Sequence, residues 1–136
     1  MKIGMAIVAP IVLVVCNASA GALANAAAAA GISAQDLPVL GVFGKTQDVM
    51  RDPKSLQVDT LLTSVSGDTA VGCMVYRARN GFGGMNVDRA TWVFTNGKLF
   101  FSPNGAALWN KWCANKQMTD RTDIAKKLAK HAAESN

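Results

Sequence analysis

Two arginines lead into a glycine-rich loop in the stretch RARNGFGGMN, residues 77–86, and such a loop could hold a phosphate group. A phosphate-binding loop has a helix directly after its glycines, so that main-chain N–H groups and the helix N-terminus face the anion. Here a strand pattern precedes the loop and a second strand pattern follows it. The spacing Gly81-x-Gly83-Gly84 also fits neither common phosphate-loop motif. We therefore expect no phosphate site and no cofactor.

The same loop could stack on a nucleic-acid base through Phe82, which stands among Arg77, Arg79 and Arg89. Three arginines around one aromatic residue are a weak indication, so we expect no nucleic-acid partner. We interpret the loop as a tight reversal in which Asn80 and Gly81 adopt left-handed conformations and Phe82 folds inward over the sheet. Loops on rigid scaffolds often contact partners, and the candidate contact residues are Arg77, Arg79, Asn80 and Phe82.

Carboxylate pairs are the second feature that could do chemistry, since general acid–base catalysis often uses two of them. Asp48 and Asp52 are four residues apart, but Asp52 precedes Pro53 and fits the N-cap of a short helical turn. Nothing in the sequence would shift the pKa of either carboxyl group as catalysis requires. We predict no catalytic residues.

The alternative is a small cell-wall or glycan-active enzyme with tryptophans as sugar platforms. It would use aspartates that are scattered along the chain: Asp48, Asp52, Asp59, Asp68 and Asp88. A tryptophan-lined groove that holds two aspartates about 5–10 Å apart would favour this alternative.

The first residues of the chain are typical of a secretory signal peptide over residues 1–20. Lys2 supplies a positive charge, residues 3–15 are almost entirely apolar, and Ala18-Ser19-Ala20 forms a small-x-small cleavage site. Cleavage after Ala26 is the alternative. We expect a periplasmic or secreted protein.

Cys16 lies within this signal peptide, and a lipid anchor on it is disfavoured because the bulky Val15 precedes it. Cleavage leaves two cysteines, Cys73 and Cys113, and an even number in a small exported protein indicates a disulfide. The bond would close a loop of about 40 residues and stabilise the fold by roughly 3–4 kcal/mol. We expect no metal site, because His131 is the only histidine and no CxxC pair is present.

The formal net charge of +5 would allow contact with anionic lipids or envelope polymers. The charges are spread along the chain, so we interpret them as a contribution to solubility. The final segment, residues 120–136, is a basic amphipathic helix whose apolar side is mostly alanine. Membrane contact through this helix would be weak, and we expect it to pack on the domain.

Residues 21–34 are rich in alanine and form a flexible leader, so we place one small domain at residues 35–136. Val49 and Met50 belong to a short helix that ends before Pro53. Four strand patterns follow in sequence, and Asn96-Gly97 marks a two-residue hairpin turn between the last two. The four patterns cover residues 58–65, 70–79, 90–94 and 99–101.

Both faces of the resulting sheet carry apolar side chains and need cover. Cys73 lies on one face with Val71, and Met74 lies on the other. Leu108, Trp109, Trp112 and Cys113 recur at helical spacing and form a core-facing stripe, which we place on the face of Cys73. The sequence thus predicts an α+β domain: a four-stranded antiparallel meander packed by N-terminal and C-terminal helices, with one disulfide.

Several of these motifs resemble those of small exported bacterial and prophage proteins of uncharacterised function. That pattern runs DPxS, then VCG in a strand, then NxxNxFGGY and a late cysteine. The matching positions are Asp52-Pro53-Lys54-Ser55, Cys73, Val75, Asn80, Phe82, Gly83, Gly84 and Trp112-Cys113. The chain departs from the pattern at Met74, Arg77 and Met85. The resemblance implies an α+β domain of the cell envelope and implies no reaction.

We therefore expect an exported, non-catalytic domain that binds another envelope component, either a protein or a polymer. The sequence leaves open the partner, the oligomeric state and the cleavage site.

Overall fold

The computed structural model describes residues 33–134. The expected signal peptide, Cys16 and the leader up to residue 32 lie outside the described residues.

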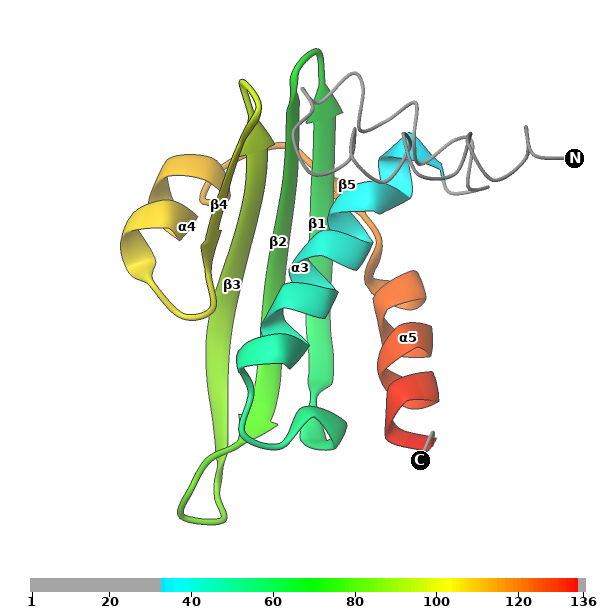
Figure 1. Cartoon of the computed structure of the whole chain (residues 1–136), viewed down its shortest axis with the longest axis vertical. Coiled ribbons are helices and arrows are strands. Elements are labelled where there is room, and N and C mark those ends of the chain that lie inside the picture. Colours follow the sequence, from blue (N-terminus) through cyan, green and yellow to red (C-terminus); the bar gives the residue numbers. More distant parts are fainter. Residues whose placement is uncertain (1–32, 135–136) are drawn as a thin grey trace, which may run out of the picture.

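A five-stranded antiparallel sheet with the strand order β4-β3-β2-β1-β5 forms the centre of the molecule (Figure 1). Its strands are β1 Gln57–Ser66, β2 Thr69–Arg79, β3 Met85–Thr95, β4 Lys98–Ser102 and β5 Thr119–Asp120. The first four form the predicted meander. The prediction of only four strands is wrong, because Thr119 and Asp120 pair with Thr63 and Leu62 at the β1 edge. A strand of two residues is too short to produce an alternating sequence pattern.

Glycine and asparagine make the tight turns between strands. Asn96 has a φ of 51° and Gly97 a φ of 73°, which confirms the predicted Asn-Gly hairpin between β3 and β4. The β1–β2 turn uses Gly67, with a φ of 56°. In β1, Asp59 lies at a register shift between Val58 and Thr60, which is a β-bulge.

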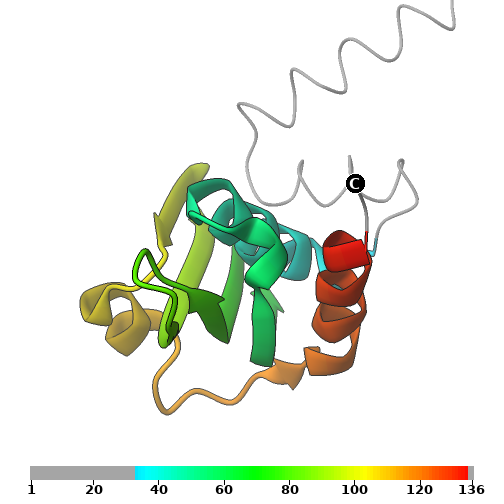
Figure 2. The ribbon, with the colours of Figure 1, turned by 90° about the horizontal axis from the view of Figure 1, so that it is seen from below.

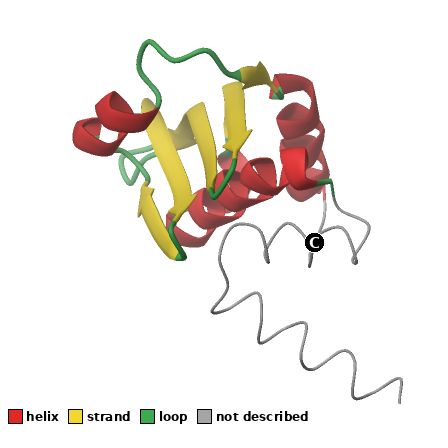
Figure 3. Cartoon of the chain, turned by 90° about the horizontal axis from the view of Figure 1, so that it is seen from above, coloured by secondary structure: helices red, strands yellow, loops and turns green. Residues whose placement is uncertain are grey.

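Within residues 33–134, three α-helices pack around the sheet: α3 Leu37–Val49, α4 Ala106–Trp112 and α5 Thr122–Glu134. Two short 3₁₀ helices, η1 Ala34–Asp36 and η2 Pro53–Ser55, precede α3 and β1. Helix α3 crosses one face of the sheet, and α5 lies beside the β1 edge (Figure 2). Helix α4 and α3 lie on opposite faces of the sheet. The segment that follows α4 crosses the same face as α4 and leads to β5 (Figure 3).

The helices differ from the sequence prediction in two respects. The helix before Pro53 is much longer than expected, since α3 begins at Leu37 and covers the sheet face of Met74 and Trp92. Helix α4 has only seven residues, and none of them is fully buried. It lies on the face of Cys73, as predicted, but covers only part of it because it makes just two turns.

The main core lies between α3, α5 and the sheet. Its fully buried side chains include Val39, Val42, Leu61, Met74 and Ala90. A smaller core on the opposite face consists of Val71, Cys73, Val93 and Cys113, with Trp109, Trp112 and Met118 packed against it. The sheet is therefore apolar on both faces, as its strand pattern indicates.

Candidate functional site

One side chain, that of Asn80, organises the hairpin loop between β2 and β3, which we define as residues 80–84. Its Oδ1 accepts hydrogen bonds from the main-chain N–H of Phe82 (2.9 Å) and of Gly84 (3.1 Å). Its own N–H donates to the Gly84 carbonyl at 2.8 Å. The left-handed residue of the loop is Gly83, with a φ of 86°, and the expectation of left-handed Asn80 and Gly81 is wrong. The hydrogen bonds to the Asn80 side chain stabilise the turn, so Asn80 itself does not need a positive φ.

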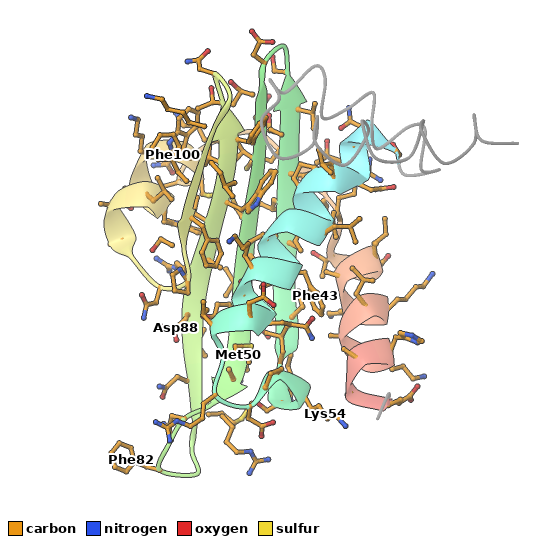
Figure 4. All side chains as sticks on the ribbon, viewed as in Figure 1. Phe43, Met50, Lys54, Phe82, Asp88 and Phe100 are labelled. Atoms are coloured by element: carbon orange, nitrogen blue, oxygen red, sulfur yellow. A yellow bond between two sulfur atoms is a disulfide. The ribbon has the colours of Figure 1, made fainter. Side chains whose placement is uncertain are left out.

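Phe82 is fully exposed at the tip of the hairpin loop (Figure 4). The prediction that it folds inward is wrong. The last strand pair is Arg79 with Met85, so Phe82 lies beyond the end of the sheet, where it has no apolar surface to cover. An aromatic ring held in water on a hydrogen-bonded loop is a candidate contact for a partner.

The two candidate arginines at the end of β2 each pair with an aspartate. The Nε of Arg77 lies 3.1 Å from the Oδ2 of Asp59, and the Nε of Arg79 lies 3.5 Å from the Oδ2 of Asp52. Both arginine side chains are more than half exposed, so each pair contributes only about 0–1 kcal/mol. Asp52 is the N-cap residue of η2 and Pro53 follows it in the first turn, as predicted. Its side chain makes no capping hydrogen bond, however, and its carboxylate pairs with Arg79 instead.

Beside Arg79 lies a cleft of about 640 Å³ between α5 and the start of β1. Four cationic side chains line it: Lys54, Arg79, Lys126 and Lys130. The buried Leu56, Val58 and Ala129 also line it and give it an apolar component. Its one lining carboxylate within the described residues, Asp59, is already paired with Arg77. We call this feature the basic cleft; it suits an anion that also carries apolar groups.

Sequence reasoning missed the basic cleft. Lys126 and Lys130 are four residues apart on a helix, so their shared face was predictable. Lys54 comes from η2 and Arg79 from the end of β2, and only the tertiary fold brings them to α5. Among the four predicted contact residues, the cleft includes Arg79, while Asn80 and Phe82 belong to the hairpin loop.

The three tryptophans of the chain differ in burial and in their neighbours. Trp92 is buried, and Trp109 and Trp112 are half-buried. Arg89 lies 5.6 Å from the ring centre of Trp109, and Lys111 lies at the same distance from Trp112. Each cation therefore covers one ring. In the described part of the chain, three cavities are lined by Trp109 or Trp112, and Asp88 is the single aspartate among their lining residues.

The predicted disulfide between Cys73 and Cys113 is confirmed. Its Cα atoms are 5.9 Å apart, and it joins β2 to the end of α4. The bond lies inside the smaller core, next to Val71 and Val93.

Helix α5 uses its apolar side within the fold. Ala125 and Ala129 are buried in the main core, and Ile124, Leu128 and Ala132 pack against it. This confirms the prediction that the helix packs on the domain. No helix in residues 33–134 is long and apolar enough to cross a membrane.

Residues 33–134 contain no group of three histidine, cysteine, aspartate or glutamate side chains that could hold a metal ion. The chain matches no known protein family, no curated protein and no solved structure with which it was compared.

Proposed function

We propose that this protein is an exported, non-catalytic domain that binds an anionic component of the cell envelope through the basic cleft. The convergence of Lys54, Arg79, Lys126 and Lys130 on one concave surface carries this proposal. Cations gathered in a cleft attract and hold an anion more effectively than the same charges spread over the surface.

The hairpin loop supplies a second contact beside the cleft. Arg79 links the two, because it lines the cleft and ends the strand from which the loop leaves. Phe82 adds an exposed aromatic surface at the tip. The resemblance to small exported bacterial and prophage proteins supports the same setting, since it implies an envelope domain with no reaction. The ligand we expect is a polymer that bears repeated phosphate or carboxylate groups.

Calorimetric titration of the exported protein with polyphosphate and with polyglutamate tests this proposal. The Lys126→Gln/Lys130→Gln variant removes two cations from the basic cleft, and Lys98→Gln/Lys116→Gln removes two exposed cations elsewhere. We expect the cleft variant to bind roughly tenfold more weakly than the control variant, because two lost surface contacts of about 0.7 kcal/mol each amount to about 1.4 kcal/mol, which is a factor of ten. We also expect added salt to weaken binding by the unmodified protein.

Equal losses in the two variants would contradict the proposal, since the effect would then follow net charge alone. Phe82→Ala in the same titration measures the contribution of the hairpin loop. Unchanged affinity in that variant would limit the binding site to the cleft.

A further inference from the structure

Strand β3 extends well beyond the end of its neighbour β4 (Figure 1). It pairs with β2 along its whole length, from Met85 to Thr95. It pairs with β4 only from Thr91 to Thr95. The outer edge of β3 from Met85 to Ala90 therefore pairs with no other strand within residues 33–134, and we call it the free edge.

The main-chain groups at the free edge can be assigned from the turn. Thr95 and Lys98 flank a two-residue hairpin and form a hydrogen-bonded pair, so the N–H and C=O of Thr95 face β4. This direction alternates along a strand, so the same groups of Met85, Val87 and Arg89 face the free edge. No hydrogen bond outside the sheet involves these groups within residues 33–134.

The free edge has only part of the usual protection against pairing with another chain. Asp88 and Arg89 place two charges on it, and both line a cavity together with residues 104–106 at the start of α4. Edge strands are commonly blocked by proline, lysine or a bulge, or covered by another element. Residues 85–90 contain no proline and no lysine, and their register with β2 is unbroken. The side chains of Met85 and Val87 are 43% and 55% exposed. A regular edge that exposes these two apolar side chains is suited to accept a further strand.

We propose that the free edge pairs with the free edge of a second copy of this chain, antiparallel and with two-fold symmetry about Val87. In this register Val87 lies opposite Val87, Met85 opposite Arg89, and Asn86 opposite Asp88. Met85, Val87 and Arg89 all direct their main-chain groups outward, so each of their pairs closes two hydrogen bonds. The two sheets would become one continuous sheet.

Side-chain chemistry selects this register. Asn86 Oδ1 accepts a hydrogen bond from Asn80 at 3.0 Å, which leaves the Asn86 amide N–H groups able to donate. Asp88 of the second copy lies opposite and supplies a carboxylate acceptor, and symmetry makes this pair occur twice. Moving the two-fold axis to Asp88 would place two carboxylates opposite each other, which is destabilising.

The dimer should be weak and concentration-dependent. Pairing through one short strand buries less than the roughly 1,200–2,000 Å² of a stable interface, so we expect a dissociation constant of micromolar order or higher. Met85 also lines the basic cleft, but the free edge contains none of the four cations of that cleft, so the inference does not rest on the proposed function.

Sedimentation velocity of the exported protein from about 1 μM to about 500 μM tests this proposal. Val87→Pro removes an N–H that faces the free edge and that the ladder with β2 does not use, so the fold should be retained. Val87→Thr keeps this N–H and serves as the matched control. We expect dimers for the unmodified protein and for the control, and monomers for Val87→Pro with its disulfide and near-ultraviolet circular dichroism intact.

The register is tested by a charge swap that does not depend on the proline variant. Asn86→Asp places two carboxylate pairs across the interface and should weaken dimerisation roughly tenfold. Adding Asp88→Asn should restore it, because each pair again joins one amide to one carboxylate. Monomeric protein at every concentration would overturn the proposal. So would a folded Val87→Pro variant that dimerises like the unmodified protein, or equal dimerisation of Asn86→Asp and the double variant.

Discussion

Two glycines determine how closely α3 approaches the sheet. A Cβ atom added at Gly41 would overlap the indole ring of Trp92. A Cβ added at Gly72 would lie 2.7 Å from the carbonyl oxygen of Pro38. Helix and sheet are in contact at both positions with no room for a methyl group, so these glycines are required by packing.

Replacing Gly41 with alanine should destabilise the protein by about 1–3 kcal/mol, because the methyl group forces the Trp92 ring to move. Gly44→Ala is the matched control on the same helix, since a Cβ there has no neighbour within 4 Å. The control should stabilise by about 0.5–1 kcal/mol through helix propensity. Urea unfolding measures both changes, and a stabilising Gly41→Ala would contradict the close packing described for α3.

Tyr76 is the only tyrosine of the chain, which makes its ionisation directly observable. Burial raises the pKa of its phenol to about 12, and the nearby carboxylate of Asp88 adds to the rise. Its hydroxyl donates a hydrogen bond to the Pro103 carbonyl at 2.7 Å. An unfolded tyrosine ionises near pH 10, so the unfolded state loses its proton first as the pH rises.

The free energy of unfolding should therefore fall as the pH rises from about 10 to about 12, because the folded state keeps the proton over this range. Absorbance of the phenolate measures the pKa in the folded protein. Asp88→Asn should lower it, since this removes a contribution from negative charge. Titration of the native protein near pH 10 would show that Tyr76 is not buried.

At the scale of elements, α4 depends on a covalent bond more than on burial. None of its residues is fully buried, and its two tryptophans are half-buried. The Cys73–Cys113 disulfide closes a loop of 40 residues at its C-terminal end. The main core, by contrast, consists of side chains from α3, α5 and the opposite sheet face.

Cys73→Ala/Cys113→Ala should reduce the free energy of unfolding by roughly 3–4 kcal/mol. Helix α4 should detach while the main core persists, so Trp109 and Trp112 should become more accessible to an aqueous fluorescence quencher. If the free energy of unfolding of this variant stays within about 1 kcal/mol of that of the unmodified protein, apolar contacts alone are sufficient to keep α4 on the sheet.

Local rules predicted the elements that local residues determine. The Asn96-Gly97 turn follows from two residues that adopt positive φ at low cost, and the observed angles agree. The extent of α3 was not predictable in this way, because Gly41 and Gly44 lower its intrinsic helix propensity. Packing against the sheet stabilises this helix. Phe82 was misplaced because an inward fold requires an apolar surface that the end of the sheet does not provide.

At the scale of the whole molecule, the basic cleft shows what a linear sequence conceals. The interpretation of the charges as a contribution to solubility treated them as spread, which they are along the chain. Folding brings η2, the end of β2 and α5 together, and four of those charges then face one cleft. The pairing of the two cysteines was predictable from their number, whereas the gathering of cations depends on which elements become neighbours.

The disulfide also determines what happens if the exposed hairpin loop is cut. Residues 80–84 lie between Cys73 and Cys113 in the sequence, inside the covalently closed ring. Hydrolysis of a single peptide bond in this loop would therefore release no fragment. An extracellular protease that cleaves at the tip would leave a nicked protein whose two pieces separate only after the sulfur bridge is reduced.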